Sequence, residues 1–276
     1  MRQYCKSVWN FLLIFPLFFT VSVHSQEFTI ETPLPFYAGF MAADEAHETI
    51  FLIVHGTFAH KDMEIVQAFQ EALSEQSYSS LAITLPLGTP LRKNFQDCNN
   101  IAQHTHQDAL LAIDSSVNWI QQNHPGKSII LLGHSRGGNQ VVLYSRNYPL
   151  KVKAVVAVAP MVFNKNNITP LPEATDSTRI ALSQFLHCNE TEVDIKTVIS
   201  YRRDETQNTP SLLLKSGPPV KVIFGDEDRL YPRFTTMSDK LKLKVDIEVV
   251  NGADHFFRDL YAEDAVDIMI SFVEDL

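Results

Sequence analysis

The sequence predicts an α/β fold, in which a mostly parallel, doubly wound sheet carries helices on both faces. Short apolar runs alternate with segments of helical spacing along most of the chain, which is the pattern of parallel strands joined by crossover helices. Apolar residues make up 45% of the 276 residues, enough for the core of one α/β domain. The alternation is interrupted once, between Val162 and Gly217, where no strand pattern is found.

The individual elements follow from local patterns. Gln26–His47 is extended and broken by prolines, which predicts one or two edge strands. The strands expected after it are Thr49–Val54, Leu81–Leu85, Ser128–Leu132, Val152–Val158, Val220–Phe224 and Val245–Val250. Thr49–Val54 is continuously apolar, as in a strand covered on both faces, whereas Val245–Val250 alternates, as at a sheet edge. The expected helices are Met63–Leu73, Asp108–Gln121, Asn139–Arg146, Phe234–Leu241 and Leu260–Phe272.

The interrupting segment, approximately 163–217, mixes Asn, Thr, Pro and charged residues. It contains two pieces of helical spacing, Asp176–His187 and Val193–Arg202, so we expect a small helical lid inserted after the strand Val152–Val158. The lid residues that are candidates to face a pocket are Arg179, Phe185, Tyr201 and Arg203.

Residues 1–25 predict a secretory signal peptide. Arg2 and Lys6 give a short positive region, Phe11–Val23 is almost wholly apolar, and Val23-His24-Ser25 offers small residues at the flanking positions of a cleavage site. We expect cleavage after Ser25, which leaves a secreted or periplasmic domain over residues 26–276. The alternative is an uncleaved anchor, and the membrane is expected as a partner only in that case.

Charge and cysteine content narrow the list of partners. The formal net charge is −9 without a basic run, which argues against nucleic acid and against an anionic membrane surface. Once Cys5 leaves with the signal, Cys98 and Cys188 remain, and a disulfide and two unpaired thiols are both open. Neither cysteine has zinc-ligand spacing, and His104 and His106 are better explained by a helix start, so no metal is expected.

Gly133-His134-Ser135-Arg136-Gly137 lies between an expected buried strand and an expected helix. This is the pattern of a nucleophile elbow, a sharp turn that lifts a serine hydroxyl to its tip. A Cβ at either flanking glycine would crowd the strained turn. The N-terminal N–H groups of the following helix face the same point, which suits a developing negative charge.

A serine hydroxyl needs a base, and the base needs an acid that orients it. His255 is the histidine downstream of the lid, just beyond the last strand, at the sheet edge where Ser135 is also expected. The acid is expected after the strand that ends at Phe224. Asp228 is the preferred candidate and Asp226 the alternative, while Asp254 can hardly turn to orient its own neighbour.

Two backbone N–H groups are expected to bind an oxyanion at this site. One belongs to Arg136, directly after the serine, and the other to Thr57, in the loop after the first long buried strand. His55 and Gly56 of the same loop, with His134 of the elbow, are expected in the substrate-binding wall. Gly56 permits close approach, and His55 more simply braces the loop than acts as a base.

In their order along the chain, the His55-Gly56 loop, the elbow at Ser135, the Gly225-x-x-Asp228 turn and the Gly252-Ala253-Asp254-His255 turn resemble the α/β-hydrolase superfamily. The resemblance covers roughly residues 48–276. It implies a serine hydrolase that cleaves a small-molecule ester, thioester or amide through an acyl-enzyme, without a cofactor. An acyltransferase with the same residues, or a non-catalytic binding protein on this scaffold, is the alternative, and the oligomeric state is left open.

Overall fold

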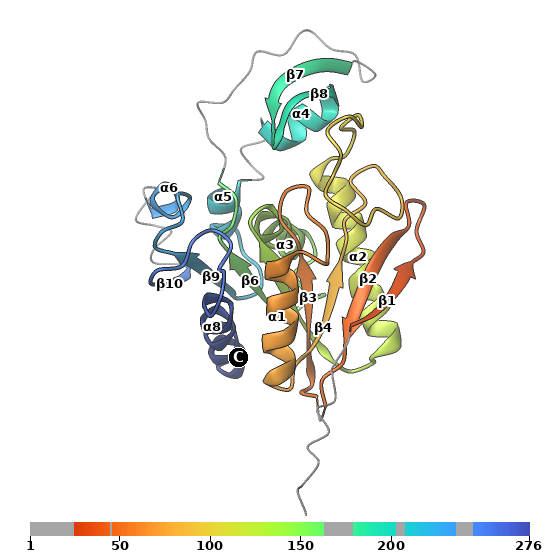
Figure 1. Cartoon of the computed structure of the whole chain (residues 1–276). Coiled ribbons are helices and arrows are strands. Elements are labelled where there is room, and N and C mark those ends of the chain that lie inside the picture. The colour runs from red at the N-terminus through yellow and green to blue at the C-terminus, as the bar shows by residue number, and fades with distance from the viewer. Residues whose placement is uncertain (1–24, 45, 163–178, 203–207, 236–244) are drawn as a thin grey trace, which may run out of the picture.

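The structure, a computed structural model, describes residues 25–44, 46–162, 179–202, 208–235 and 245–276. Its centre is an eight-stranded sheet with the strand order β1-β2-β4-β3-β5-β6-β9-β10 (Figure 1). The strands are β1 Gln26–Ile30, β2 Phe36–Met41, β3 Thr49–Val54, β4 Ser79–Ile83, β5 Ser128–His134, β6 Ala154–Val158, β9 Val220–Gly225 and β10 Asp246–Val250. All the strands predicted from the sequence are present, with ends shifted by a few residues.

In this sheet β4, β3, β5, β6, β9 and β10 run parallel, whereas β2 pairs antiparallel with both β4 and the edge strand β1. Every residue of β3, β4, β6 and β9 is buried, which fits their largely apolar sequences. In β10 exposed and half-buried positions alternate up to the buried Val250, as expected for the outermost strand. The predicted mostly parallel, doubly wound sheet is therefore confirmed.

Helices cover both faces of this sheet (Figure 1). Helices α1 (Glu64–Glu75) and α8 (Tyr261–Glu274) contact each other on one face, and α2 (His106–Asn123) and α3 (Arg136–Asn147) contact each other on the other. The start of α2 is fixed by a capping box, in which Thr105 and Asp108 satisfy each other's backbone N–H groups. Short helices α5 (Thr209–Leu213) and α6 (Tyr231–Thr235) flank β9, and the rest of the helix expected to Leu241 lies outside the described residues.

The prediction of a helix over Asp176–His187 is wrong. Arg179–Phe185 forms strand β7, which pairs antiparallel with β8 (Cys188–Asp194), whereas the second expected helical piece contains helix α4 (Ile195–Arg202). The hairpin forms because its alternating residues Ile180 and Leu182 pack on a small separate core instead of on a helix face. That core consists of Ala102, Phe185, Val193, Val198 and Tyr201. Residues 163–178 and 203–207 of the expected lid, including Arg203, lie outside the described residues.

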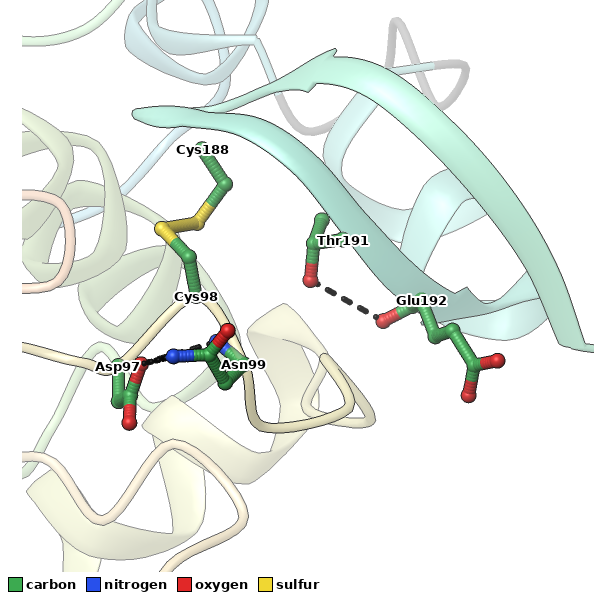
Figure 2. The surroundings of a disulfide bond; sticks show 6 residues. All are labelled: Asp97, Cys98, Asn99, Cys188, Thr191 and Glu192. Atoms are coloured by element: carbon green, nitrogen blue, oxygen red, sulfur yellow. Dashed lines mark hydrogen bonds between the residues drawn. A yellow bond between two sulfur atoms is a disulfide. The ribbon is translucent and has the colours of Figure 1, made fainter.

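The hairpin is fixed to the loop between β4 and α2. Cys98 and Cys188 form a disulfide with a Cα–Cα distance of 5.5 Å, so the first of the two open alternatives holds (Figure 2). Nearby, Ala102 donates its N–H to Glu192 and accepts the N–H of Asp194, at 2.9 and 2.8 Å. These links hold β7, β8 and α4 above the end of the sheet toward which β3 points (Figure 1).

Of the predicted signal peptide, residues 1–25, all but Ser25 lie outside the described residues, so its presence stays a prediction. Within the described ranges, none of the helices combines the length and the apolar character needed to cross a bilayer.

Candidate active site

Ser135 lies in the turn between β5 and α3. Its backbone has φ 55° and ψ −114°, a left-handed conformation that costs a non-glycine residue about 1–3 kcal/mol. A Cβ at Gly133 would collide with the backbone of Gly137, and one at Gly137 with the carbonyl oxygen of Val54. The turn therefore requires glycine on both sides of the serine.

Ser135, His255 and Asp228 form one continuous hydrogen-bonded chain. His255 follows β10, with Nε2 3.0 Å from Ser135 Oγ and Nδ1 2.8 Å from Asp228 Oδ2. The Asp228 side chain is fully buried after β9, and its other oxygen accepts the N–H of Leu230 at 2.8 Å. Because an ionised carboxylate only accepts hydrogen bonds, Nδ1 carries the proton and Nε2 is left to accept from the serine hydroxyl.

The other nearby carboxylates have different partners. Asp226, the alternative acid, is exposed and accepts the N–H of Gly252 at 2.6 Å. Asp254 pairs with Arg258 at 2.7 Å. Of the candidate acids, the structure brings Asp228 against the imidazole, whereas Asp226 stabilises the turn that leads to it.

His134 supports the loop that carries His255. Its buried ring donates from Nε2 to the backbone carbonyl of His255 at 2.8 Å, and the two ring centres lie 5.0 Å apart. Burial, and then the neighbouring His255, lower the pKa of His134 to about 3. The ring is therefore neutral at ordinary pH and ties the loop to the end of β5.

His55 and Gly56 lie in the pocket wall beside the serine. A Cβ at Gly56 would come 3.2 Å from the Cβ of Ser135, so glycine permits the close approach. The His55 ring accepts the N–H of Leu85 on Nε2 at 2.9 Å, and its Nδ1 donates to the Gly56 carbonyl at 2.8 Å. Since burial lowers its pKa to about 3 and both nitrogens bind backbone groups, His55 braces the loop.

Arg92 has a supporting role that sequence analysis missed. Its buried guanidinium donates to the carbonyl oxygens of Ala59 at 2.6 Å and Leu85 at 2.8 Å, and so joins the loop after β3 to the loop after β4. Burial lowers its pKa to about 10, which leaves it charged. No local pattern identifies it, because its partners are backbone carbonyl oxygens of two loops, which any residue type can supply.

Thr57 and Arg136, the expected oxyanion-binding residues, both line the pocket and are joined by their side chains. The Nε–H of Arg136 donates to Thr57 Oγ1 at 3.0 Å. The guanidinium also lies over the ring of Tyr201, 4.7 Å from its centre. The loop after β3 and the first turn of α3, which flank Ser135, are thus linked through side chains.

The site opens into a cavity of about 730 Å³, a volume within the usual range for small-molecule sites. Its apolar wall includes Met63, Ile65, Val66, Phe95, Met161 and Leu186. Its rim is charged and includes Glu227, Arg229, Arg233, Asp254 and Arg258. The cavity can therefore hold an apolar group beside the serine and a polar group at the mouth.

The lid residues divide between the cavity and other positions. Tyr201 lines the cavity, whereas Arg179 is exposed and Phe185 is buried in the small lid core. Leu186 and His187, in the turn between β7 and β8, also line the cavity and were not predicted. Their position in the cavity wall depends on the β7–β8 hairpin, which the sequence pattern did not indicate.

His104 and His106 lie beneath the lid. Both are buried, and His106 stacks on Tyr201 with 4.4 Å between the ring centres. Burial lowers the pKa of His104 to about 4 and that of His106 well below its ordinary value. In the part of the chain that the structure describes, no cluster of metal-ligating side chains is found.

Solved structures show the class of fold. Over 90% of this chain and 99% of the other, the structure is similar to Est1E from Butyrivibrio proteoclasticus, with a TM-score of 0.66 and 18% identity. It is also similar to the esterase PF2001 from Pyrococcus furiosus, with a TM-score of 0.63 and 14% identity over 98% and 96% of the two chains. The fold is that of the α/β hydrolases.

The family follows from the sequence comparison. The profile of the family described as serine aminopeptidase, S33, matches residues 45–223. This match spans well over half of the chain, and the chain belongs to this family.

Two curated relatives match part of the chain. A Mycoplasma genitalium protein assigned as a candidate esterase/lipase is 26% identical over 179 residues, which cover 54% of this chain and 65% of that protein. The monoacylglycerol lipase of Mycolicibacterium smegmatis is 26% identical over 133 residues, which cover 40% of this chain and 48% of the lipase. The chain thus spans less than two thirds of the length of either relative.

Proposed function

We propose that the protein is a serine hydrolase that cleaves carboxylic esters. The observation that carries the proposal is the unbroken hydrogen-bonded chain from buried Asp228 through His255 to Ser135 Oγ in the cavity wall. Two relatives named as a monoacylglycerol lipase and a candidate esterase/lipase support the choice of ester over amide.

In the proposed reaction, Ser135 Oγ attacks the ester carbonyl carbon and its proton passes to His255 Nε2. The charge that forms on the carbonyl oxygen is bound by the backbone N–H groups of Thr57 and Arg136. His255 returns the proton to the alcohol as the carbon–oxygen bond breaks. Water then attacks the acyl-serine by the same route, and Asp228 stabilises the imidazolium in both steps.

The test is covalent labelling with a fluorophosphonate probe, which requires an activated serine. We expect the wild-type protein to be labelled and to hydrolyse p-nitrophenyl esters, and Ser135→Ala and His255→Ala to do neither. Ser115→Ala, in which the changed hydroxyl only bonds to its own helix, is the matched control and should behave as wild type. Absence of labelling in a folded wild-type protein would instead favour a binding protein.

We further propose that the chain is exported with removal of residues 1–25. The Cys98–Cys188 disulfide supports this, because such bonds persist in oxidising compartments. N-terminal sequencing of the protein from its native host should begin at Gln26, whereas a chain that keeps residues 1–25 would overturn the proposal.

A further inference from the structure

The side chains of Thr57, Arg136 and Tyr201, which we call the Arg136 bridge, join three separate segments of the molecule. Thr57 belongs to the loop after β3, Arg136 to the first turn of α3, and Tyr201 to the lid helix α4. The guanidinium lies between the other two, with Nε 3.0 Å from Thr57 Oγ1 and Cζ 4.7 Å from the Tyr201 ring centre. All three side chains line the cavity that contains Ser135.

The first half of the bridge acts on the proposed oxyanion hole. The two proposed N–H donors belong to the same two residues whose side chains are hydrogen-bonded. An oxyanion hole works when its donors are fixed before charge develops, because no reorganisation is then needed in the transition state. The Arg136-to-Thr57 hydrogen bond is charge-assisted and partly buried, so it restrains the distance between the loop after β3 and the first turn of α3.

The second half of the bridge reaches the lid. Tyr201 is buried and fixed on both sides, since it stacks on His106 and meets His104 edge-on with 5.3 Å between ring centres. A desolvated cation over an aromatic face is held more strongly than an exposed one. Arg136 is the second cause, after burial, of the lowered pKa values of His104 and His106, which shows that its charge acts on this same cluster.

We propose that Arg136 is a positioning residue that fixes the distance between the oxyanion-binding N–H groups. Through its contact with Tyr201, that distance also depends on the position of the lid helix α4. This inference rests on the proposed function. It assigns to a lid residue an effect on the rate of the chemical step, beyond any contact with substrate.

The first test separates the Thr57 hydroxyl from its backbone N–H. Thr57→Val keeps the shape and the N–H but removes the acceptor, and we expect kcat for an ester to fall about tenfold with little change in KM. Thr57→Ser restores the acceptor and should recover most of the lost rate. Rates are expressed per active site, titrated with the fluorophosphonate, and melting temperatures are measured in parallel, so a loss of folded protein is not counted.

The second readout is specific to the oxyanion hole. A thionoester places sulfur, a weak hydrogen-bond acceptor, where the ester carbonyl oxygen would be, so the ratio of ester to thionoester kcat reports how well the hole works. In Thr57→Val this ratio should fall about tenfold. A change in packing alone would slow both substrates equally.

The lid half is tested with variants on α4. Tyr201→Leu removes the aromatic face and should lower the same ester-to-thionoester ratio by about fivefold, whereas Tyr201→Phe keeps the face and should restore it. Ile199→Ala, at an exposed position of the same helix, is the control and should leave the ratio at the wild-type value.

The outcomes distinguish this inference from the proposed function. If wild type neither labels nor hydrolyses esters, the proposed function fails. If wild type is active but Thr57→Val and Tyr201→Leu leave the ester-to-thionoester ratio unchanged, the Arg136 bridge has no positioning role and the inference is overturned, while the hydrolase remains.

Discussion

The carboxyl edge of the sheet and the lid are built by different means. At the sheet edge, Ser135, Asp228 and His255 each lie in a turn that directly follows a strand of the main core. The lid packs its own small core, and its links to the body include one disulfide, two backbone hydrogen bonds around Ala102 and the contacts of Tyr201 with Arg136 and His106. The proposed catalytic side chains are therefore placed by the main core, while a locally supported unit shapes the cavity above them.

The largest effect is expected at the sheet edge, from the pair Asp228→Asn and Asp226→Asn. Asp228→Asn keeps the shape but offers an amide to the His255 imidazole, so we expect kcat to fall by about 10⁴-fold. Asp226→Asn changes only an exposed carboxylate that accepts the N–H of Gly252, and its kcat should fall less than about threefold. Steady-state ester hydrolysis measures both, and equal losses in the two variants would contradict the assignment of the acid.

The next effect should appear in the lid. Replacing Cys98 and Cys188 together by serine opens a disulfide with a sequence separation of 90, and we expect the free energy of unfolding to fall by about 3 kcal/mol. Amide exchange should accelerate in β7 and β8 far more than in β3 and β5, because the main core is unchanged. Hydrogen-exchange mass spectrometry measures this, and equal acceleration throughout would show that the lid is not a locally supported unit.

Acid should destabilise both regions through their buried histidines. The pKa values of His55 and His134 are lowered to about 3, and that of His104 to about 4, from an ordinary 6.5. Below pH 6.5 the unfolded chain therefore binds protons that the folded chain does not. The contribution of each histidine to the free energy of unfolding is therefore fully present above pH 6.5. It is lost as the pH falls below 6.5, by up to about 1.4 kcal/mol per pH unit for each histidine.

Denaturant unfolding between pH 4.5 and 7.5 measures this slope. His104→Phe keeps an aromatic ring between Phe58 and Tyr201 but does not titrate, so the slope should decrease by about one proton. An unchanged slope would mean that His104 is not held neutral beneath the lid.

The smallest effect is expected from His134→Phe, which keeps a ring but removes the N–H that binds the carbonyl of His255. The loop should then sample more positions, and we expect kcat to fall about three- to tenfold with KM unchanged. Stopped-flow measurement of acylation gives the rate. A fall in kcat/KM that comes from a higher KM alone, with kcat unchanged, would instead show that His134 contacts substrate.

The sheet and most of the site could be predicted because their signals are local. A buried strand followed by a tight turn can be recognised from neighbouring residues, as at Gly133 to Gly137 and at His255. The choice between Asp226 and Asp228 needed coordinates, because it depends on how far the chain runs past β9 before it turns back.

The lid could not be predicted in the same way. Arg179–Phe185 is compatible with helical spacing, and it forms a strand by pairing with β8. Strand β8 is in turn held by the disulfide from Cys188 to Cys98, 90 positions away. The support given by Arg92 and the link from Arg136 to Tyr201 likewise join residues distant in sequence. These features depend on tertiary contacts that leave no local pattern.

The central claim is that the Ser135 hydroxyl, activated by His255, forms a covalent acyl intermediate. Mixing the protein with excess p-nitrophenyl ester, quenching in acid within milliseconds and measuring the intact mass tests this directly. We expect a single acyl adduct that maps to the peptide containing Ser135 and that is absent from Ser135→Ala. Turnover without an adduct at Ser135, or unchanged turnover in Ser135→Ala, would contradict the account.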